Sequence, residues 1–575
     1  MRMKKRGCGP QTAALLSLWA VKAVAGVVVW NGGGADGKWT TPGNWTGGAL
    51  PLATDTVEFG SGFDSGNIIL DASQTVAGMI INYNKSSGGL YLGGVPANAL
   101  TLNGNIKRTG GVSHLVFTCP VILNDTLTIT NEASGNTRFA RPVTSGHDII
   151  FQGNIGSALE FSDNNRATFS GDVYVYGLSK NNVISSYKDG GFGTGDIHMY
   201  GCTMLKFRGE SQTVSNNIAI KGTRSIEWGS NTTDGFYDHV GDITTDEVVG
   251  TFFSIGGINT TVRLSGVNTG PANSRISLCG SIDDPVGKGK FIIANTAALS
   301  WGYNIIGNSS YDITVMLEDG VAITNYMTRL RDNVTGRVTL GNETAGATNL
   351  ISTTMNIGNF DSNVKGDRTI WLTSASNSLV RFTGRFHEDN VGDVMNIVKE
   401  GPGAVSMSYA SDYKGTTVIS NGTLLANNAT GSATSTNTVT VCEGGVLGGT
   451  GIVSGRVTVR QGGAVSPGDG AGCLTVADLV FEEGAAFVWD ATAAAQDLLS
   501  VSGDLTLPSA LTVTVNNASG ENLPTAGVVI MSCAGTLSGT TDGWTVASPN
   551  TVRLSDSGQQ VLLCGPPQGT MISVR

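Results

Sequence analysis

Short alternations of apolar and polar residues fill the chain, and glycine interrupts them at regular intervals. In the C-terminal half, residues 457–459 (Val-Thr-Val) are followed by the polar turn 460–463 and a second apolar stretch, 464–465. Alternation places the two valines on one face of a strand. Glycine then accepts the positive φ that a tight turn needs. Each unit is therefore predicted to hold a strand, a turn and a second strand.

The unit recurs at a nearly even spacing. Five aligned units have their leading glycines at Gly422, Gly444, Gly462, Gly484 and Gly503. One unit cannot bury its apolar face alone, so it must stack on copies of itself. A period of roughly 20 residues suits one rung of a parallel β-helix and is too short for a propeller blade of roughly 40 residues.

The ordered motifs of this region resemble a known family. Residues 397–407 contain Lys399-Glu400-Gly401-Pro402-Gly403 and run into 413–418 and 421–425. Together they resemble the autotransporter-associated β-strand repeat (passenger-associated transport repeat), whose pattern is K-x-G-x-G-x-L, Y-x-G-x-T and G-x-L. Residues 448–451 and 462–468 match its G-G-x-G and L-S-P-G elements, with Val465 where the family more often has Leu.

The resemblance is strongest over 395–565 and weaker upstream. Residues 161–165 and 192–197 resemble degenerate copies, and 30–59 resemble the usual opening of mature proteins in this group. The family implies an all-β, right-handed parallel β-helix exported to the cell surface or beyond, and the handedness rule for parallel crossovers agrees. About 20 residues per rung predicts roughly 27 rungs.

Pattern strength divides the chain into five segments. The predicted order is a signal peptide, an N-terminal cap with the first rungs, an irregular central β-helix, the autotransporter-associated repeat region and a tail: 1–25, 26–150, 151–394, 395–565 and 566–575.

Composition supports a glycine-rich β protein. Glycine is 81 of 575 residues and charged residues are 14%, against about 7% and 25% in ordinary soluble domains. The formal charge is −10. Without the five basic residues of the first 25 it becomes 30 − 45 = −15. That sign disfavours nucleic acid and anionic membranes as partners.

The N-terminus has the pattern of a signal peptide. A basic segment, 1–6, precedes the apolar stretch 12–21, and Ala23-Val24-Ala25 predicts cleavage before Gly26. The apolar stretch is too short to span a bilayer.

A full autotransporter also carries a C-terminal membrane barrel. The repeats run almost to the final segment, 565–575, so we expect neither a barrel nor an apolar sorting anchor here. The expectation is release, or export and retention by an unidentified component.

Seven cysteines follow the predicted signal peptide, and an odd number cannot all pair within one chain. The spacing between Cys442 and Cys473 equals that between Cys533 and Cys564. Equal spacing fits disulfides between stacked repeats. The favoured interpretation is that each cysteine is a small core hydrophobe.

Candidate catalytic residues are few. Asp283-Asp284 and Gly146-His147-Asp148 resemble acid-pair and histidine motifs of polygalacturonase-like β-helix enzymes. Their chain order is reversed and no N-T-D element precedes Asp283. A turn is the favoured role for Asp283-Asp284-Pro285.

Other ionisable residues lack a catalytic or metal-binding pattern. Glu482-Glu483 is expected to be solvated turn charge, and Asp469-Gly470 a turn without the calcium nonapeptide repeat. The five histidines lack metal-ligand spacing: His114, His147, His198, His239 and His387. No catalytic, cofactor or metal residue is therefore assigned, and no cofactor is expected.

Three tryptophans near the mature N-terminus, Trp30, Trp39 and Trp45, suit either sugar stacking or a cap over the exposed strand edges. The cap or a core role is favoured.

The sequence as a whole predicts an exported, non-enzymatic adhesion or binding scaffold. Its expected partner is a surface glycan or another cell-surface protein. A polysaccharide lyase or hydrolase and a structural surface-layer component are the alternatives.

Overall fold

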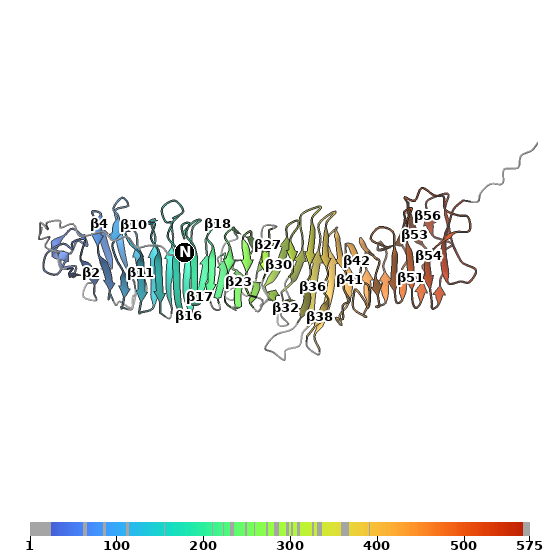
Figure 1. The fold of residues 1–575 in the computed structure, drawn as a ribbon, viewed down its shortest axis with the longest axis horizontal. Helices are drawn as coiled ribbons and strands as arrows, with labels where there is room; N and C mark the ends of the chain where they lie inside the picture. The colour runs from blue at the N-terminus through green and yellow to red at the C-terminus, as the bar shows by residue number, and fades with distance from the viewer. Residues whose placement is uncertain are drawn as a thin grey trace, which may run out of the picture.

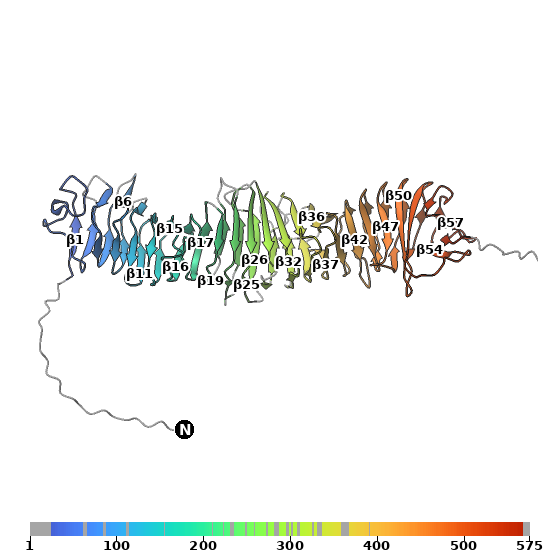
Figure 2. The ribbon, with the colours of Figure 1, turned by 90° about the horizontal axis from the view of Figure 1, so that it is seen from above.

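Stacked β-strands form one elongated solenoid along the chain (Figures 1 and 2). The computed structural model describes residues 25–566 apart from short gaps, which are 61–65, 84–87, 111–113, 155, 210, 222–223, 230–234, 246, 248–249, 258, 272–273, 281–286, 295–297, 301–302, 307–310, 325–326, 331–335, 358–366 and 390–391. The described residues form β1 to β58 and one 3-10 helix, η1 (Pro42–Asn44). The predicted all-β parallel solenoid is confirmed.

The largest sheet has 24 strands in two rows, which share the long strands β16 and β17. The first row comprises β1 Val27–Trp30, β2 Thr56–Phe59, β5 Gly78–Ile81, β8 Ile106–Arg108, β11 Leu127–Asn131, β14 Ile149–Gly153, β16 Val173–Ser186, β17 Ile197–Phe207, β19 Ile218–Lys221, β22 Ile243–Thr244, β25 Val267–Thr269 and β28 Ala298–Ser300. The second row adds β3 Asn67–Leu70, β6 Gly89–Gly94, β9 His114–Phe117, β12 Gly135–Phe139, β15 Ser157–Phe161, β20 Arg224–Trp228, β23 Gly250–Ile255, β26 Arg275–Gly280, β29 Tyr303–Ile306, β32 Met327–Leu330, β35 Thr354–Ile357 and β38 Phe386–Glu388.

Four further groups of strands complete the turns. A four-stranded sheet lies near the N-terminus: β4 Gln74–Val76, β7 Leu100–Leu102, β10 Val121–Leu123 and β13 Val143–Thr144. A 14-stranded sheet comprises β18 Gln212–Val214, β21 Phe236–His239, β24 Asn259–Leu264, β27 Lys288–Ile293, β30 Asp312–Leu317, β33 Val338–Gly341, β36 Asp367–Thr373, β39 Val394–Glu400, β41 Thr417–Ile419, β43 Val439–Val441, β46 Val457–Val459, β49 Leu479–Phe481, β52 Leu505–Thr506 and β55 Leu537–Ser538. A ten-stranded sheet comprises β31 Ala322–Ile323, β34 Thr348–Ile351, β37 Leu379–Phe382, β40 Ala404–Met407, β42 Gly422–Ala426, β44 Gly445–Gly449, β47 Ala464–Pro467, β50 Ala485–Ala491, β53 Leu511–Asn517 and β56 Thr545–Val546. The last sheet comprises β45 Ile452–Val453, β48 Cys473–Val476, β51 Leu498–Val501, β54 Val528–Cys533, β57 Thr551–Leu554 and β58 Gln560–Cys564.

Alternation of side chains fills the interior of the solenoid. In β46, Val457 and Val459 are buried and Thr458 lies between them on the outer face, as the sequence pattern predicts. Aromatic rings stack inside over successive turns, with neighbouring centroids 5.1–6.1 Å apart: Phe117, Phe139, Phe161, Phe192, Phe207, Trp228 and Phe253. Such contacts add stability beyond the burial of area and favour one alignment of adjacent turns.

The predicted column of turn glycines is confirmed for four of its five members. Gly422 donates its N–H to the carbonyl of Gly444, Gly444 to Gly462, and Gly462 to Gly484. All four have φ between 66° and 77°, where glycine is strongly favoured. The alignment of Gly503 is wrong, because Gly484 donates to Ala510 instead.

The fifth predicted unit, around Gly503, does not continue the column of the other four. Residues 499–501 lie in β51, and Leu499 pairs with Leu474 of β48, whereas β49 pairs with β52.

The predicted period is also too short. The structure has about 16 turns, about 25 residues apart, and therefore fewer rungs than predicted. The cause is that the central turns are longer than those on which the period was measured. Val338 and Ile370 face each other across one long central turn, whereas Val439 and Val457 do so across a much shorter one.

Both ends of the solenoid are closed differently from its middle. At the N-terminal end Trp30, Trp39 and Trp45 are buried around Phe59, with Trp45 4.8–4.9 Å from the other two tryptophan rings. The favoured capping or core role of these residues is confirmed. At the C-terminal end β58 pairs antiparallel with both β54 and β57.

The cysteines do not form the disulfides that their spacing suggested. Cys442, Cys473, Cys533 and Cys564 are free thiols. The favoured core role fits the buried Cys119, Cys279, Cys533 and Cys564, but it is wrong for the exposed Cys473 and only partly met by the half-buried Cys442. In the antiparallel pairing of β54 with β58, Cys564 lies opposite Gly527 and therefore at the far end of the strand from Cys533. Cys442 and Cys473 belong to different parts of their turns, since Cys473 lies in the sheet of β48 and Cys442 directly follows β43.

The predicted segment boundaries at 150 and 395 stay predictions, since the 24-stranded and 14-stranded sheets run through these positions. The right-handed sense of the solenoid also stays a prediction. Nearly all of the predicted signal peptide and most of the tail lie outside the described residues. Among the described residues no helix is long and apolar enough to cross a membrane.

Candidate functional site

The element Gly146-His147-Asp148 belongs to a hydrogen-bonded turn. Asp148 Oδ1 accepts the backbone N–H of Asp172 at 2.9 Å, and Asp172 Oδ1 accepts that of Asp196 at 2.8 Å. The series continues through the next turns, so that a ladder of side chains joins Asp148, Asp172, Asp196, Asn217 and Asp242. We call this series the turn ladder. Its carboxylates hold adjacent turns together rather than facing each other as an acid pair.

The remaining acidic candidates also lie in turns, where the structure describes them. Glu483 accepts hydrogen bonds from the N–H and Oγ–H of Ser509, each at 2.8 Å, and these bonds lower the pKa of its carboxyl group. Asp469 accepts a 3.4 Å hydrogen bond from Asn427, and Gly470 beside it has a φ of 96°. Asp283 and Asp284 lie outside the described residues.

The histidines are dispersed along the solenoid. His239 is buried in the interior against Phe207 and Trp228, and burial lowers its pKa to about 3. His114 and His147 are exposed at other turns. Within the described part of the chain, no group of three or more His, Cys, Asp and Glu side chains is arranged to hold a metal ion.

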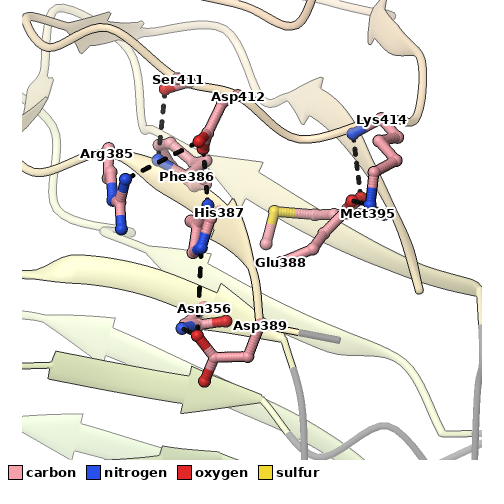
Figure 3. Close-up of polar contacts among 10 residues, drawn as sticks. All are labelled: Asn356, Arg385, Phe386, His387, Glu388, Asp389, Met395, Ser411, Asp412 and Lys414. Atoms are coloured by element: carbon pink, nitrogen blue, oxygen red, sulfur yellow. Dashed lines mark hydrogen bonds and ion pairs between the residues drawn. The ribbon is translucent and has the colours of Figure 1, made fainter. Parts of the chain in front are cut away.

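His387, on the outer side of β38, lies between two carboxylates (Figure 3). Its Nδ1 is 2.7 Å from Asp412 Oδ1, and its Nε2 is 4.0 Å from Asp389 Oδ1. Arg385 Nη1 lies 3.7 Å from the other oxygen of Asp412, and Asn356 of the preceding turn donates to Asp389 at 2.5 Å. The cluster therefore joins side chains from three successive turns.

Glu388, next to His387, points the other way and is buried. It accepts the backbone N–H groups of Met395 at 2.6 Å and Lys414 at 2.9 Å, and its second oxygen is 3.1 Å from Lys414 Nζ (Figure 3). The nearby Ser411 hydroxyl accepts the N–H of Phe386 at 3.2 Å. These contacts fix the backbone of neighbouring turns, so the arrangement favours a structural role over catalysis.

Four aromatic side chains stand on the outer face of the first row. Tyr174 and Tyr176 alternate with buried valines on β16, and His198 and Tyr200 alternate with buried apolar residues on β17. The register pairs Tyr174 with His198 and Tyr176 with Tyr200. Their rings are nearly parallel, with centroids 4.4 and 4.6 Å apart. We call these four residues the aromatic strip.

Polar groups position the aromatic strip. Asp172 of the turn ladder places Oδ2 3.3 Å from both Tyr174 Oη and His198 Nε2. Burial, followed by the charges of Asp172 and Asp148, raises the pKa of Tyr174. Lys221 of the following turn holds its ammonium group 5.7 Å from the centre of the Tyr200 ring.

A hollow adjoins each end of the aromatic strip, over the consecutive strands β11, β14, β16, β17, β19 and β22 of the first row. Of these strands, β11, β16, β17 and β19 are labelled in Figure 2. The N-terminal hollow is lined by Thr130, Asn131, Glu132, Gln152, Gly153, Asn154 and Tyr176. The C-terminal hollow is lined by Tyr174, His198, Tyr200, Ala219, Ile220, Lys221, Thr244 and Thr245. Both combine an aromatic ring with hydroxyl, amide or ammonium groups, which is the composition of a small-molecule binding site.

Among the sequence predictions, Trp30, Trp39 and Trp45 are the candidate sugar-stacking residues, and the aromatic strip is absent. Its pattern is nevertheless present, because Val-Tyr-Val-Tyr at 173–176 recurs one turn later as Ile-His-Met-Tyr at 197–200. The turn ladder is equally legible as Gly-Asp followed by Val or Ile at 171–173, 195–197 and 241–243.

Comparison with known proteins gives a partial similarity and no family. No protein-family model matches the chain. A stretch of 73 residues, 13% of this chain, is 40% identical to part of the adhesin BmaC autotransporter of Brucella suis biovar 1 (strain 1330). The match covers 2% of that protein's length. Similarity to an autotransporter adhesin is thus found over a limited stretch, and the assignment of the specific repeat stays a prediction.

Proposed function

We propose that this chain is an exported, non-enzymatic binding scaffold of the adhesin-like, autotransporter-passenger type, which acts at the cell surface or outside the cell. The observation that carries the proposal is the outer face of the solenoid, where the aromatic strip and its two hollows stand on rigid, paired strands. The partial similarity to an autotransporter adhesin supports it.

The placement of those acidic candidates that the structure describes favours binding over hydrolysis. A polysaccharide hydrolase needs two carboxylates about 5–10 Å apart that face a common substrate bond. Asp148 and Glu483 instead accept backbone N–H groups of neighbouring turns. In the His387 cluster, Asp412 contacts His387 of a neighbouring turn, and Asp389 accepts a hydrogen bond from Asn356 of another.

Export and adhesion are tested on the full chain. The gene is expressed with an epitope tag in a Gram-negative host, and exposure is measured by labelling and protease treatment of intact cells. Adhesion of these cells to host-cell layers is then compared with that of cells lacking the chain. We expect surface or extracellular tag and increased adhesion. Tag retained inside the cell would contradict the proposal.

Enzymatic activity is tested in parallel on the exported chain. Polysaccharides are incubated with it, with and without calcium, and new reducing or unsaturated ends are measured. Formation of new ends would favour the lyase or hydrolase alternative. Export without adhesion or turnover would favour a structural surface-layer component.

A further inference from the structure

We propose that the aromatic strip and its two hollows bind a neutral glycan, through pyranose rings that pack against the outermost ring faces. The inference rests on the proposed scaffold function and names the ligand class of that surface. Tyr176 is 40% exposed although one face of its ring packs on Tyr200.

The stacking leaves defined ring faces available. Within each pair, one face of each ring is covered by its partner at 4.4–4.6 Å. The opposite face of Tyr176 borders the N-terminal hollow, and His198 borders the C-terminal one. A pyranose ring has an apolar C–H face and a rim of hydroxyl groups, so it matches a site with an aromatic wall and polar edges.

The N-terminal hollow supplies hydrogen-bonding groups suited to hydroxyls. Thr130 donates to Gln152 Oε1 at 3.2 Å, so the amide N–H₂ of Gln152 is directed away from this bond. Asn154 lines the same hollow. Amide and hydroxyl side chains both donate and accept hydrogen bonds, as sugar hydroxyls do.

The C-terminal hollow exists because a small residue follows an aromatic one. His198 is followed in its column by Ala219, which pairs with it in register. The methyl group of Ala219 leaves space that a larger side chain would fill, and Lys221 and Thr244 border that space. His198 is held in orientation by Asp172, so the ring wall is formed before a ligand arrives.

Charge favours a neutral glycan over an acidic one. The turn ladder carries four aspartates beside the aromatic strip: Asp148, Asp172, Asp196 and Asp242. The whole chain is also acidic, at −10. These aspartates outnumber Lys221, the cation that lines the C-terminal hollow, so uronate or sulfate groups would meet mostly like charge along this side. Hydroxyl groups can donate hydrogen bonds to carboxylates.

The test measures retention of the purified full chain on immobilised neutral polymers (β-1,3-glucan, β-1,4-glucan, mannan and xylan) and on acidic polymers (polygalacturonate and heparin). Tyr176→Ala removes the wall of the N-terminal hollow, and Ala219→Leu fills the C-terminal hollow without altering the strip. Tyr176→Phe keeps the ring. Tyr409→Ala removes a tyrosine that is 54% exposed elsewhere and serves as the matched control.

We expect retention on at least one neutral polymer, weakened about tenfold, which corresponds to about 1.4 kcal/mol, by Tyr176→Ala, because it removes the ring wall, and by Ala219→Leu, because it fills the space beside His198. Tyr176→Phe and Tyr409→Ala should bind as the unaltered chain does. Circular dichroism and protease resistance establish that each variant is folded.

Two results would overturn the assignment. One is stronger retention on the acidic polymers; the other is absence of retention on every neutral polymer while cell adhesion persists, which would point to a protein ligand and leave the proposed function standing. Conversely, retention on neutral polymers by a chain that is never exported would overturn the proposed function and leave the glycan site standing.

Discussion

Lys399, the lysine of the K-x-G-x-G motif, lies inside the solenoid. Its side chain is fully buried on β39, and Nζ donates to the backbone carbonyls of Glu400 at 2.9 Å, Gly401 at 2.8 Å and Asn421 at 2.9 Å. One ammonium group thus satisfies three carbonyls in the turns of two successive rungs. We predict that Lys399→Met destabilises these turns.

The magnitude follows from two opposing contributions. Three partly buried carbonyls lose a charged donor, at about 2 kcal/mol each. Against this, methionine removes the cost of burying a charge. Burial lowers the pKa of Lys399 from 10.5 to about 8 despite the opposing charge of Glu400, and a shift of that size corresponds to about 3 kcal/mol. The expected net loss is about 2–4 kcal/mol near pH 7.

The lowered pKa also predicts the direction of a pH effect. Between pH 8 and pH 10.5 the folded chain binds fewer protons at Lys399 than the unfolded chain does, so stability rises with pH across this window. Lys399→Met lacks the group and should lack this rise. The difference between the two proteins should therefore widen as the pH is raised.

Amide hydrogen exchange is the suitable assay, because long repeat arrays open locally and do not unfold in one step. After correction for intrinsic rates, amides of β39 and β42 should exchange roughly 30 to 900 times faster in Lys399→Met. Lys107→Met is the control, since Lys107 forms a surface ion pair with Glu132 and should change stability by less than about 1 kcal/mol. Equal or slower exchange in Lys399→Met, or the same pH dependence in both proteins, would refute the reasoning.

Three further predictions concern the interior and the ends. Burial lowers the pKa of His239 to about 3, against 6.5 in model compounds. The free energy of unfolding should therefore decrease by up to about 4–5 kcal/mol as the pH falls from 6.5 to 3. Thermal melts at pH 4 and pH 7 should differ less for His239→Phe than for the unaltered chain. Trp45→Ala should cost about 3–5 kcal/mol, with faster amide exchange confined to the first turns; exchange raised along the whole rod would contradict nearest-neighbour stacking. In thiol labelling of the folded chain, exposed Cys473 should react before the buried Cys533 and Cys564, and equal rates would count against the C-terminal packing.

The fold was predictable because its cause is local and repeated. Each turn needs only a short alternation and a glycine that accepts positive φ, and both are visible at Gly444 and Gly462. The exact turn length was not predictable in the same way. Loops between strands tolerate insertions at little cost. The short turn from Val439 to Val457 and the long one from Val338 to Ile370 consequently belong to the same sheet.

The candidate site was harder to predict because it depends on alignment between turns. Tyr174 and His198 are ordinary residues in isolation, and only the pairing of β16 with β17 brings their rings to 4.4 Å. Asp148 shows the reverse problem, since a His-Asp pair that resembles a catalytic element forms backbone hydrogen bonds in a repeating turn. A site predicted from residues adjacent in sequence is unreliable in a solenoid, because the residues in contact in space are about one full turn apart in the sequence.

The strand register of this region aligns the side chains of the interior and those of the outer face together. Phe207 and Trp228 stack inside the same turns that carry the aromatic strip or follow it, and a shift of one residue along β16 or β17 would exchange the inner and outer faces of that strand. The buried stack therefore fixes the register that aligns Tyr176 with Tyr200 outside. A one-residue deletion within 173–176 should abolish glycan retention by turning the tyrosines inward, whereas a short insertion beside the exposed Lys188 should preserve it. Equal retention by both variants would mean that the alignment of the rings is irrelevant to binding.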